Sequence, residues 1–327
     1  MTKSSREVAA ISERFDASAE IVVCVPSFRR AEHLQLTLAS LARQRFARRF
    51  AVVVVENDAA NRAAVPVAAQ AFRRGPLQGL CVVEEAQGNC RAINAAFETA
   101  LERFPAATML LMIDDDEIAS SDWLRRMVEA AETSGAGVVG GPVLPHFSDD
   151  LKQGLRRHPA FCPAYDRSGP VPIIYGSGNC LIRRSVFAAL AEPQFDLRFN
   201  FLGGGDTDFF TRCRRAGLTF YWAADAIISE TVPEVRTTPR WLMTRGLRIG
   251  AINYHVECKA AHTAGSRLRL CGKTLARLPL SLFRAGRLAM TDQPLPIVMH
   301  PMIVAAGSVL AAIGIEPRPY EASKIAS

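Results

Sequence analysis

The stretch that decides the fold is "MLLMIDDDEIASSDW", from Met109 to Trp123. Five apolar residues are followed abruptly by four acids, Asp114, Asp115, Asp116 and Glu117. A short apolar run that ends in polar residues is typical of a buried strand. Two like unit charges ~4 Å apart repel by roughly 1 kcal/mol in water and about 4 kcal/mol at an intermediate dielectric. A divalent cation is the obvious group to offset that repulsion.

Three more apolar runs precede this one and also end in polar residues. They are "EIVVCVPSF" (20–28), "FAVVVVEND" (50–58) and "GLCVVEEA" (79–86). Between the runs, residues 31–44, 61–74 and 89–104 have the spacing of amphipathic helices. The alternation predicts an α/β fold with a mostly parallel sheet flanked by helices on both faces. Such sheets bind ligands beyond the carboxyl ends of their strands, so we expect residues 27–30, 56–58 and 114–117 to meet there.

The sequence after Trp123 continues with mixed signals. We expect a helix over 122–133, a Gly-rich strand over 135–143 and a loop over 145–175. Residues 173–190 read as a strand and then a helix, 199–217 as a Gly-rich loop running into a helix, and 218–230 as a strand or strand pair.

Composition and charge restrict the class of protein. The 327 residues are 49% hydrophobic, which is enough for a large core. The net charge is +7, and residues 236–290 hold eleven Lys or Arg against one acid, Glu257. None of the eight cysteines forms a C-x-x-C pair, so a zinc or redox motif is not supported. Several lie in apolar runs, which favours reduced core cysteines and the cytosol. We expect no signal peptide, because the first sixteen residues lack an apolar core.

Three interpretations of the acidic run compete. It can be an acidic turn before a helix with Asp122 at its N-cap. It can be a phosphatase-type D-x-D, although that motif belongs after a first strand and this one follows the fourth. It can also be a divalent-metal site, since Mg²⁺ and Mn²⁺ bind carboxylates together with substrate phosphates. Asp114 and Asp116 are two apart, so both can turn toward one ligand.

A second acidic cluster is "LGGGDTDFF", Leu202 to Phe210. Its three glycines allow close backbone approach, and Asp206 and Asp208 offer a general base. The alternative is that Asp206 or Thr207 caps the helix that follows.

Five segments together resemble inverting glycosyltransferase family 2, which has the GT-A fold. They are "VCVPSFRR", "VVVVEND", "LLMIDDDEIASSDWL", "GSGNCLIRRSVF" and "FNFLGGGDTDFF", and the resemblance covers roughly residues 20–250. It is greatest to bacterial members that build exopolysaccharide and lipopolysaccharide.

The resemblance implies a role for each matching residue. It implies Mn²⁺ or Mg²⁺ held by Asp114 and Asp116 as the D-x-D, and Asp206 as catalytic base. The implied donor-binding residues are Pro26, Ser27, Arg29, Glu56, Asn57, Asp58, Asn94, Asp114 and Asp115. On the acceptor side we expect Gly204, Gly205, Asp208 and Asn179.

This chain departs from the family pattern in three places. Gly205 stands where the family usually has Glu before the catalytic Asp, so Asp208 is a candidate substitute. The usual Arg-Asn pair reads Ile93-Asn94, and Arg91 is the alternative contact. A family His that completes the metal shell has no equivalent near Ser229 and Glu230.

The basic C-terminal region has a character of its own. Residues 240–261 and 267–290 mix Leu, Trp and Phe with Arg at helical spacing, as in helices that lie in a membrane interface. Residues 296–315 are apolar and long enough to span a bilayer, yet carry His300 and Pro301. Peripheral association, a span and a helical cap on the catalytic domain all stay open. DNA binding is less favoured because no recognition motif adjoins the basic run.

We therefore expect an N-terminal tail (1–19), a GT-A catalytic domain (20–235) and a basic, helical, membrane-associating extension (236–327). The expected enzyme moves a sugar from a nucleotide-diphosphate donor, with UDP-sugar favoured, to a saccharide or lipid-linked acceptor at the inner face of the cell membrane. The alternatives are a non-catalytic nucleotide-sugar-binding protein and a sugar nucleotidyltransferase.

Overall fold

The computed structural model describes residues 6–148 and 150–317. Its strands are β1 (Glu7–Ile11), β2 (Ile21–Ser27), β3 (Ala51–Glu56), β4 (Gly79–Val83), β5 (Met109–Met112), β6 (Glu117–Ala119), β7 (Val138–Gly140), β8 (Val143–Phe147), β9 (Gly169–Val171), β10 (Cys180–Arg183), β11 (Phe220–Trp222) and β12 (Ile228–Val232). Its α-helices are α1 (Ala31–Ala42), α2 (Ala64–Arg74), α3 (Asn89–Arg103), α4 (Trp123–Ser134), α5 (Arg184–Ala189), α6 (Gly205–Arg215), α7 (Pro239–Cys258), α8 (Ala264–Ala289) and α9 (Leu295–Ala312). Short 3₁₀ helices are η1 (Asp150–Arg157), η2 (Leu197–Phe199) and η3 (Glu234–Thr237).

One large sheet forms the centre of the molecule, with strand order β1-β4-β3-β2-β5-β10-β7-β11-β9. Strands β4, β3, β2 and β5 are parallel to one another. Strand β10 is antiparallel to both β5 and β7, so β7 and β11 run in the same direction as the first four. The chain order reverses at β2, which lies between β3 and β5 and so marks a ligand-binding position in an open α/β sheet. The expected α/β class with a mostly parallel sheet is confirmed.

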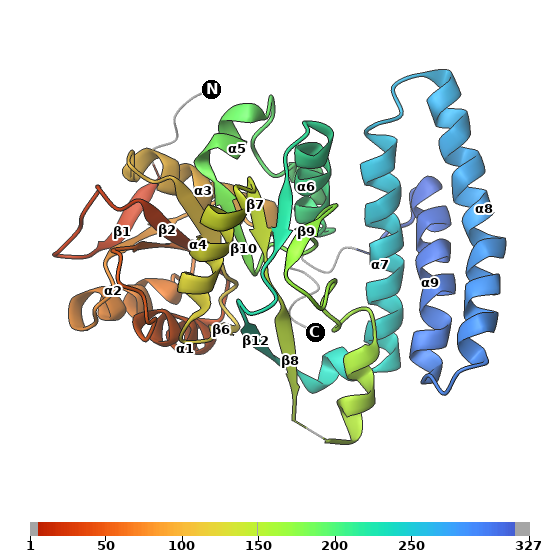
Figure 1. Ribbon diagram of the computed structural model, residues 1–327, viewed down its shortest axis with the longest axis horizontal. Helices are drawn as coiled ribbons and strands as arrows, with labels where there is room; N and C mark the ends of the chain where they lie inside the picture. Colours follow the sequence, from red (N-terminus) through yellow and green to blue (C-terminus); the bar gives the residue numbers. More distant parts are fainter. Residues whose placement is uncertain (1–5, 149, 318–327) are drawn as a thin grey trace.

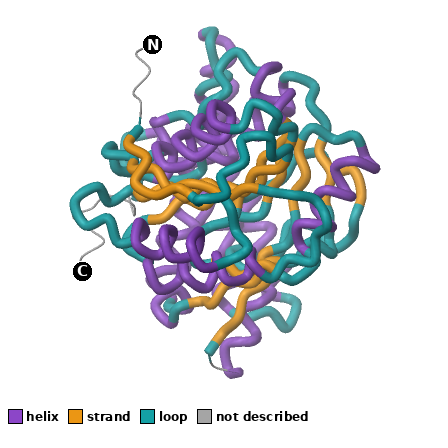
Figure 2. The backbone as a smooth tube through the Cα atoms, turned by 90° about the vertical axis from the view of Figure 1, so that its left-hand side faces the viewer, coloured by secondary structure: helices purple, strands orange, loops and turns teal. Residues whose placement is uncertain are grey.

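Two apolar cores cover the two faces of this sheet. Because side chains alternate along a strand, Val22 and Cys24 of β2 pack with α3 and α6, while Ile21, Val23 and Val25 pack with α1, α2 and α4. Figure 2 shows the strands running across the molecule with helices on either side. Burial on both faces explains why these strands are continuous apolar runs.

Two expectations about local structure differ from what is observed. Residues 7–11, expected to belong to an N-terminal tail outside the catalytic domain, form strand β1, which pairs antiparallel with β4 at the sheet edge. The 145–175 region contains the end of β8 together with η1 and β9, rather than loop alone. Strands β1, β8 and β9 gain their hydrogen bonds from the neighbouring strands β4, β12 and β11, so their own sequences carry little periodicity.

The C-terminal region is helical, as expected. Helices α7, α8 and α9 stand beside the sheet domain, with α9 between the other two (Figure 1). Helix α9 is long and apolar enough to cross a membrane by length and composition alone. The division into a catalytic domain (20–235) and an extension (236–327) stays a prediction.

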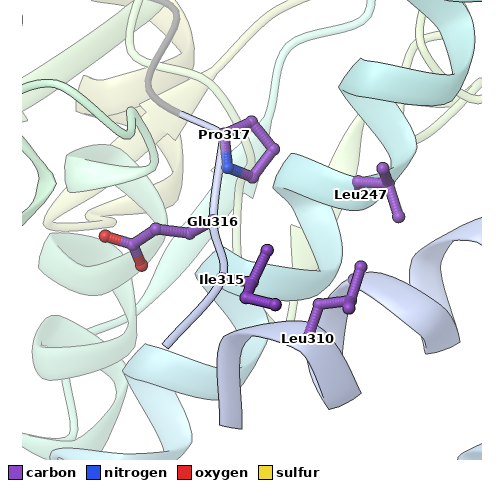
Figure 3. A pocket seen from close by; sticks show the side chains of 6 residues that line it. Leu247, Leu310, Ile315, Glu316 and Pro317 are labelled. Atoms are coloured by element: carbon purple, nitrogen blue, oxygen red, sulfur yellow. The ribbon is translucent and has the colours of Figure 1, made fainter. Parts of the chain in front are cut away.

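A small hollow of about 180 Å³ lies at the C-terminal end of α9, beside the middle of α7. Its lining comes from α7, α9 and the turn after α9, including Leu247, Leu310 and Ile315 (Figure 3). None of the sheet-edge acids lines it, so it is not the candidate active site.

Candidate active site

The acids after β5 meet the loop after β2. The Ser27 hydroxyl donates to Asp115 at 2.8 Å, and the Phe28 amide donates to the same carboxylate at 3.3 Å. Arg30 reaches both Asp115, at 3.1 Å, and Asp116, at 2.7 Å. Asp115 is buried, so its carboxylate joins two neighbouring strand ends from inside the protein.

The remaining acids of this loop form a dense negative cluster. The Glu117 carboxylate accepts from the Asp114 amide at 2.8 Å. Burial, together with the charges of Asp116 and Asp115, raises the pKa of Asp114 to about 8. Burial and the adjacent Asp114 raise the pKa of Glu117 well above its usual range. Glu230 of β12 adds a fifth carboxyl, and burial raises its pKa too, although it is ion-paired with Arg236.

This donor chemistry fits a divalent cation that also binds a diphosphate. Within residues 6–148 and 150–317, no group of three or more His, Cys, Asp or Glu side chains is arranged to hold a metal alone. Mg²⁺ sites commonly use one or two carboxylates and complete their shell with waters and substrate phosphates. Asp114 and Asp116 supply such a pair. A cation would also relieve the repulsion that raises the pKa of Asp114.

The loops after β2 and β3 are tied together. Arg29 has a left-handed backbone, with φ of 57°, and donates to Asp58 at 2.6 Å. Pro26 lies in β2 opposite Val55 of β3. The sequence-predicted residues of these two loops are therefore neighbours at one sheet edge.

Other predicted donor-side residues hold the backbone that forms this edge. Glu56 is buried and accepts from the Asp58 amide at 2.7 Å and the Ala64 amide at 2.6 Å. Asn57 donates to two carbonyls of the loop after β4 and accepts from the Gly88 amide at 2.8 Å. Asn94 of α3 both donates to and accepts from the Phe195 backbone. Their side chains are committed within the protein, so they position the loops.

Asp206 lies in the first turn of α6, and its carboxylate accepts from the Gly176 amide at 2.8 Å. Burial raises its pKa. Helix α6 begins after Gly204, which has a left-handed φ of 86°, and no side chain caps it. The N-cap is therefore Gly204 rather than Asp206 or Thr207, although backbone amides of Asp206 and Thr207 in the first turn also stabilise the Asp206 carboxylate.

The segment 176–178 links the two acidic clusters. Gly176 holds Asp206, while a Cβ at Gly178 would lie 2.6 Å from the Glu117 carboxylate. The buried Cys180 thiol, whose pKa burial raises, feels the charges of both Asp114 and Asp206. The D-x-D loop and the candidate base therefore face a common region.

Two residues expected on the acceptor side are not available there. Asp208 is buried and ion-paired with Arg212 and Lys259, each at 2.8 Å. Asn179 is buried as well; it accepts from the Trp123 indole and donates to the carbonyls of Pro142 and Ala226. Both expectations are corrected, because these polar groups already have partners inside the fold.

The two glycines before Asp206 are required by packing. A Cβ at Gly204 would lie 2.5 Å from the Ile252 side chain of α7. A Cβ at Gly205 would lie 2.5 Å from the Cys90 sulfur. The space that a family Glu at position 205 would need is filled by Cys90.

Sequence reasoning placed Arg30 at this edge without giving it a role, and it missed Glu230 and Arg236 as residues of this site. Arg30 bridges Asp115 and Asp116, and Arg236 lies 3.6 Å from Asp116. The pair "RR" after Phe28 was a signal for Arg30. Arg236 lies more than a hundred residues after the acids in the sequence, so no local sequence pattern could predict that it contacts them.

Comparison with known proteins identifies the family. A family model described as "Glycosyltransferase like family 2" matches residues 19–248. The chain belongs to glycosyltransferase family 2. The resemblance seen in the sequence is thereby confirmed, and the chain is a glycosyltransferase.

Individual relatives agree with this family. Succinoglycan biosynthesis protein ExoM of Rhizobium meliloti (strain 1021) is 31% identical over 322 residues, covering 94% of this chain and 97% of that protein. An N-acetylglucosaminyltransferase of Rhizobium leguminosarum bv. phaseoli is 28% identical over 196 residues, covering 57% of this chain and 43% of that protein. Among solved structures, mannosyltransferase PcManGT from Pyrobaculum calidifontis, in complex with GDP-Man and Mn²⁺, has a TM-score of 0.60 at 18% identity. That likeness covers 95% of this chain and 91% of that one, and it shows that the family 2 chain has the same GT-A fold.

Proposed function

We propose that this glycosyltransferase transfers a sugar, with inversion, from a nucleotide-diphosphate donor to a hydroxyl of a saccharide or lipid-linked saccharide. The observation that carries the proposal is the convergence of the D-x-D loop and Asp206 through residues 176–178. A single-displacement transfer needs a site for the leaving group and a general base close to each other, so that both can act on one sugar.

The D-x-D loop serves the leaving diphosphate. Asp114 and Asp116 would hold Mn²⁺ or Mg²⁺, which supplies Lewis-acid stabilisation of the departing diphosphate. The Mn²⁺ and GDP-Man in the PcManGT complex are in keeping with this role. Arg30 and Arg236, beside Asp116, would neutralise further phosphate charge.

Asp206 serves the acceptor. Its carboxylate, oriented by the Gly176 amide, takes the proton of the attacking hydroxyl. Because the attack comes from the face opposite the diphosphate, one displacement inverts the anomeric carbon. Gly204 and Gly205 let α6 begin close against Ile252 and Cys90, which fixes the position of Asp206.

The donor nucleoside would lie across the ends of β2 and β3. Pro26, Ser27, Arg29 and Asp58 form this edge, and Glu56, Asn57 and Asn94 hold it in shape. We favour uridine as the base. ExoM acts in succinoglycan biosynthesis by name, so a bacterial exopolysaccharide intermediate is the proposed acceptor class, handled at the inner face of the cell membrane.

The first experiment is a thermal-shift series. UDP, GDP, dTDP and CMP are each added with and without Mn²⁺ to wild type, Asp116→Ala and a control, Asp225→Ala, whose acid is exposed and ion-paired with Arg126 of α4. At a ligand concentration 100-fold above Kd, binding stabilises by about 2.7 kcal/mol.

The expected result is a shift with one nucleotide that needs Mn²⁺, is lost in Asp116→Ala and is kept in Asp225→Ala. Transfer from the matching sugar nucleotide, followed by NMR of the product, then gives the anomer. Retained configuration, or a shift that ignores both Mn²⁺ and Asp116, would contradict the proposal.

A further inference from the structure

Helix α8 carries an exposed apolar face. Leu268, Leu275 and Leu282 are seven residues apart and therefore share one side of the helix, and Phe283 and Met290 lie next to them. Leu275 is 62% exposed, Leu282 57% and Phe283 64%. Large apolar side chains in such a row are uncommon on a water-facing surface unless they bind something.

The opposite side of α8 is the one that packs on the protein. Its buried residues are Leu270, Thr274, Ser281 and Ala285, which recur at helical spacing. In Figure 1, α8 is the outermost helix, on the far side of α7 and α9 from the sheet. The exposed leucines therefore point away from the rest of the molecule.

Basic residues line one edge of the apolar face. With 100° per residue, Arg269, Lys273, Arg284 and Arg287 fall between that face and the buried stripe on the same edge. Lys273 is partly neutralised by Glu257 of α7 at 2.8 Å, whereas the three arginines are exposed. No acid occurs between Arg267 and Met290.

Helix α9 is held in the bundle by close backbone packing on α7. It packs so closely on α7 that a Cβ at Gly250 would lie 2.1 Å from the Val304 carbonyl oxygen, and a Cβ at Gly307 would lie 2.1 Å from that of Leu247. The Ser308 hydroxyl donates to the Gly250 carbonyl at 2.9 Å. Helix α8 covers its other side. Crossing a bilayer would require α9 to give up these contacts.

We propose that the outward face of α8 docks on an anionic lipid bilayer, with its leucines and Phe283 in the acyl boundary and its arginines at the headgroups, while α9 stays within the bundle. Apolar residues flanked by arginines are the composition that interfacial helices use. Charge complementarity selects lipid over a second copy of this chain, since two α8 helices face to face would bring arginines together without an acid. The inference rests on the proposed membrane-side location and not on the transfer chemistry.

The test is co-sedimentation of the full chain with vesicles of phosphatidylcholine alone or with phosphatidylglycerol added. We compare wild type, Leu275→Ser/Leu282→Ser, Arg284→Gln/Arg287→Gln and a control, Leu36→Ser, which alters an equally exposed leucine of α1. We expect partition into anionic vesicles to fall by on the order of a hundredfold in the leucine variant and about tenfold in the arginine variant. The control should match wild type.

The proposal would be overturned by binding that does not depend on phosphatidylglycerol, by binding that the leucine variant keeps, or by a wild-type dimer in sedimentation velocity that the leucine variant abolishes. Extraction by high salt or carbonate should release the wild-type chain, whereas resistance to extraction would point to a span by α9. The nucleotide-dependent thermal shift is measured on the same variants. A normal shift without vesicle binding refutes the docking face and leaves the transferase proposal intact.

Discussion

Substitution of two acids in the same helical turn, Asp206 and Asp208, should affect catalysis and stability separately. Asp206 accepts a backbone hydrogen bond and faces the region shared with the D-x-D loop, whereas Asp208 is buried between Arg212 and Lys259. Asp206→Asn removes a base but keeps the shape of the side chain. General-base catalysis contributes roughly 10²–10⁴-fold, which corresponds to about 2.7–5.5 kcal/mol in the barrier. We expect kcat to fall by that factor, with little change in unfolding free energy.

Asp208→Asn should do the reverse. Removing one partner of a buried ion pair typically costs about 3–5 kcal/mol. Here the cost should be near the lower end, because Arg212 also donates to the Gln194 carbonyl at 2.7 Å and Lys259 also pairs with Asp196 at 2.7 Å. The folded Asp208→Asn protein should keep its turnover.

The assay measures initial transfer rates at saturating donor, normalised to folded protein, alongside urea unfolding of each variant. Donor affinity from thermal shift serves as the check that Asp206→Asn still binds nucleotide. If Asp208→Asn lost turnover while keeping its stability, or if both variants lost turnover equally, the assignment of the base to Asp206 would fail.

Three further predictions concern packing and titration. Gly250→Ala places a Cβ 2.1 Å from the α9 backbone and should destabilise the protein by about 1–3 kcal/mol, whereas Gly286→Ala, with no atom within 4 Å of the new Cβ, should stabilise it by up to about 1 kcal/mol. Urea unfolding of both variants separates the effect of helix contact from that of helix propensity. Equal changes in unfolding free energy would contradict the packing argument. Burial and the neighbouring His300 of α9 lower the pKa of His158 to about 4. As pH drops from about 6.5 toward 4, the unfolded chain therefore binds a proton at this residue before the folded protein does, and stability should fall by up to about 3 kcal/mol. His158→Gln should reduce that loss of stability, and an unchanged pH profile would exclude His158 as its source. Gly205→Glu, which restores the family residue, should lower the folding stability because its Cβ would lie 2.5 Å from the Cys90 sulfur. Adding Cys90→Ala to this variant should recover much of the lost stability. If it does not, a contact other than Cys90 limits position 205.

The sequence predicted the parts of the fold that are local patterns. Four apolar runs became β2, β3, β4 and β5, because a strand buried on both faces must be apolar at nearly every position. Strand β1 was missed, since an edge strand of five residues, exposed at both ends, has no such run. Its structure comes from pairing with β4, a partner about seventy residues away.

The candidate site shows the same division. Residue type and strand-end position were enough to bring Ser27, Asp115 and Asp116 to one edge. The sequence around Asn179 does not indicate whether its amide contacts a substrate or, as observed, hydrogen-bonds with the Trp123 indole and two backbone carbonyls. A polar residue near a motif can serve either purpose, and only its hydrogen-bond partners decide between them.

Helix α7 joins the proposed membrane face to both halves of the site. Just before its first turn, Arg236 contacts Glu230 and lies 3.6 Å from Asp116 of the D-x-D loop. Just after its last turn, Lys259 pairs with Asp208, two residues from the candidate base. Because α9 packs tightly on α7 and α8 packs on α9, a bilayer bound by α8 would set the orientation of the acid loop and of α6 together. A lipid-linked acceptor would then meet a site whose distance from the membrane is fixed by three packed helices rather than by a flexible linker.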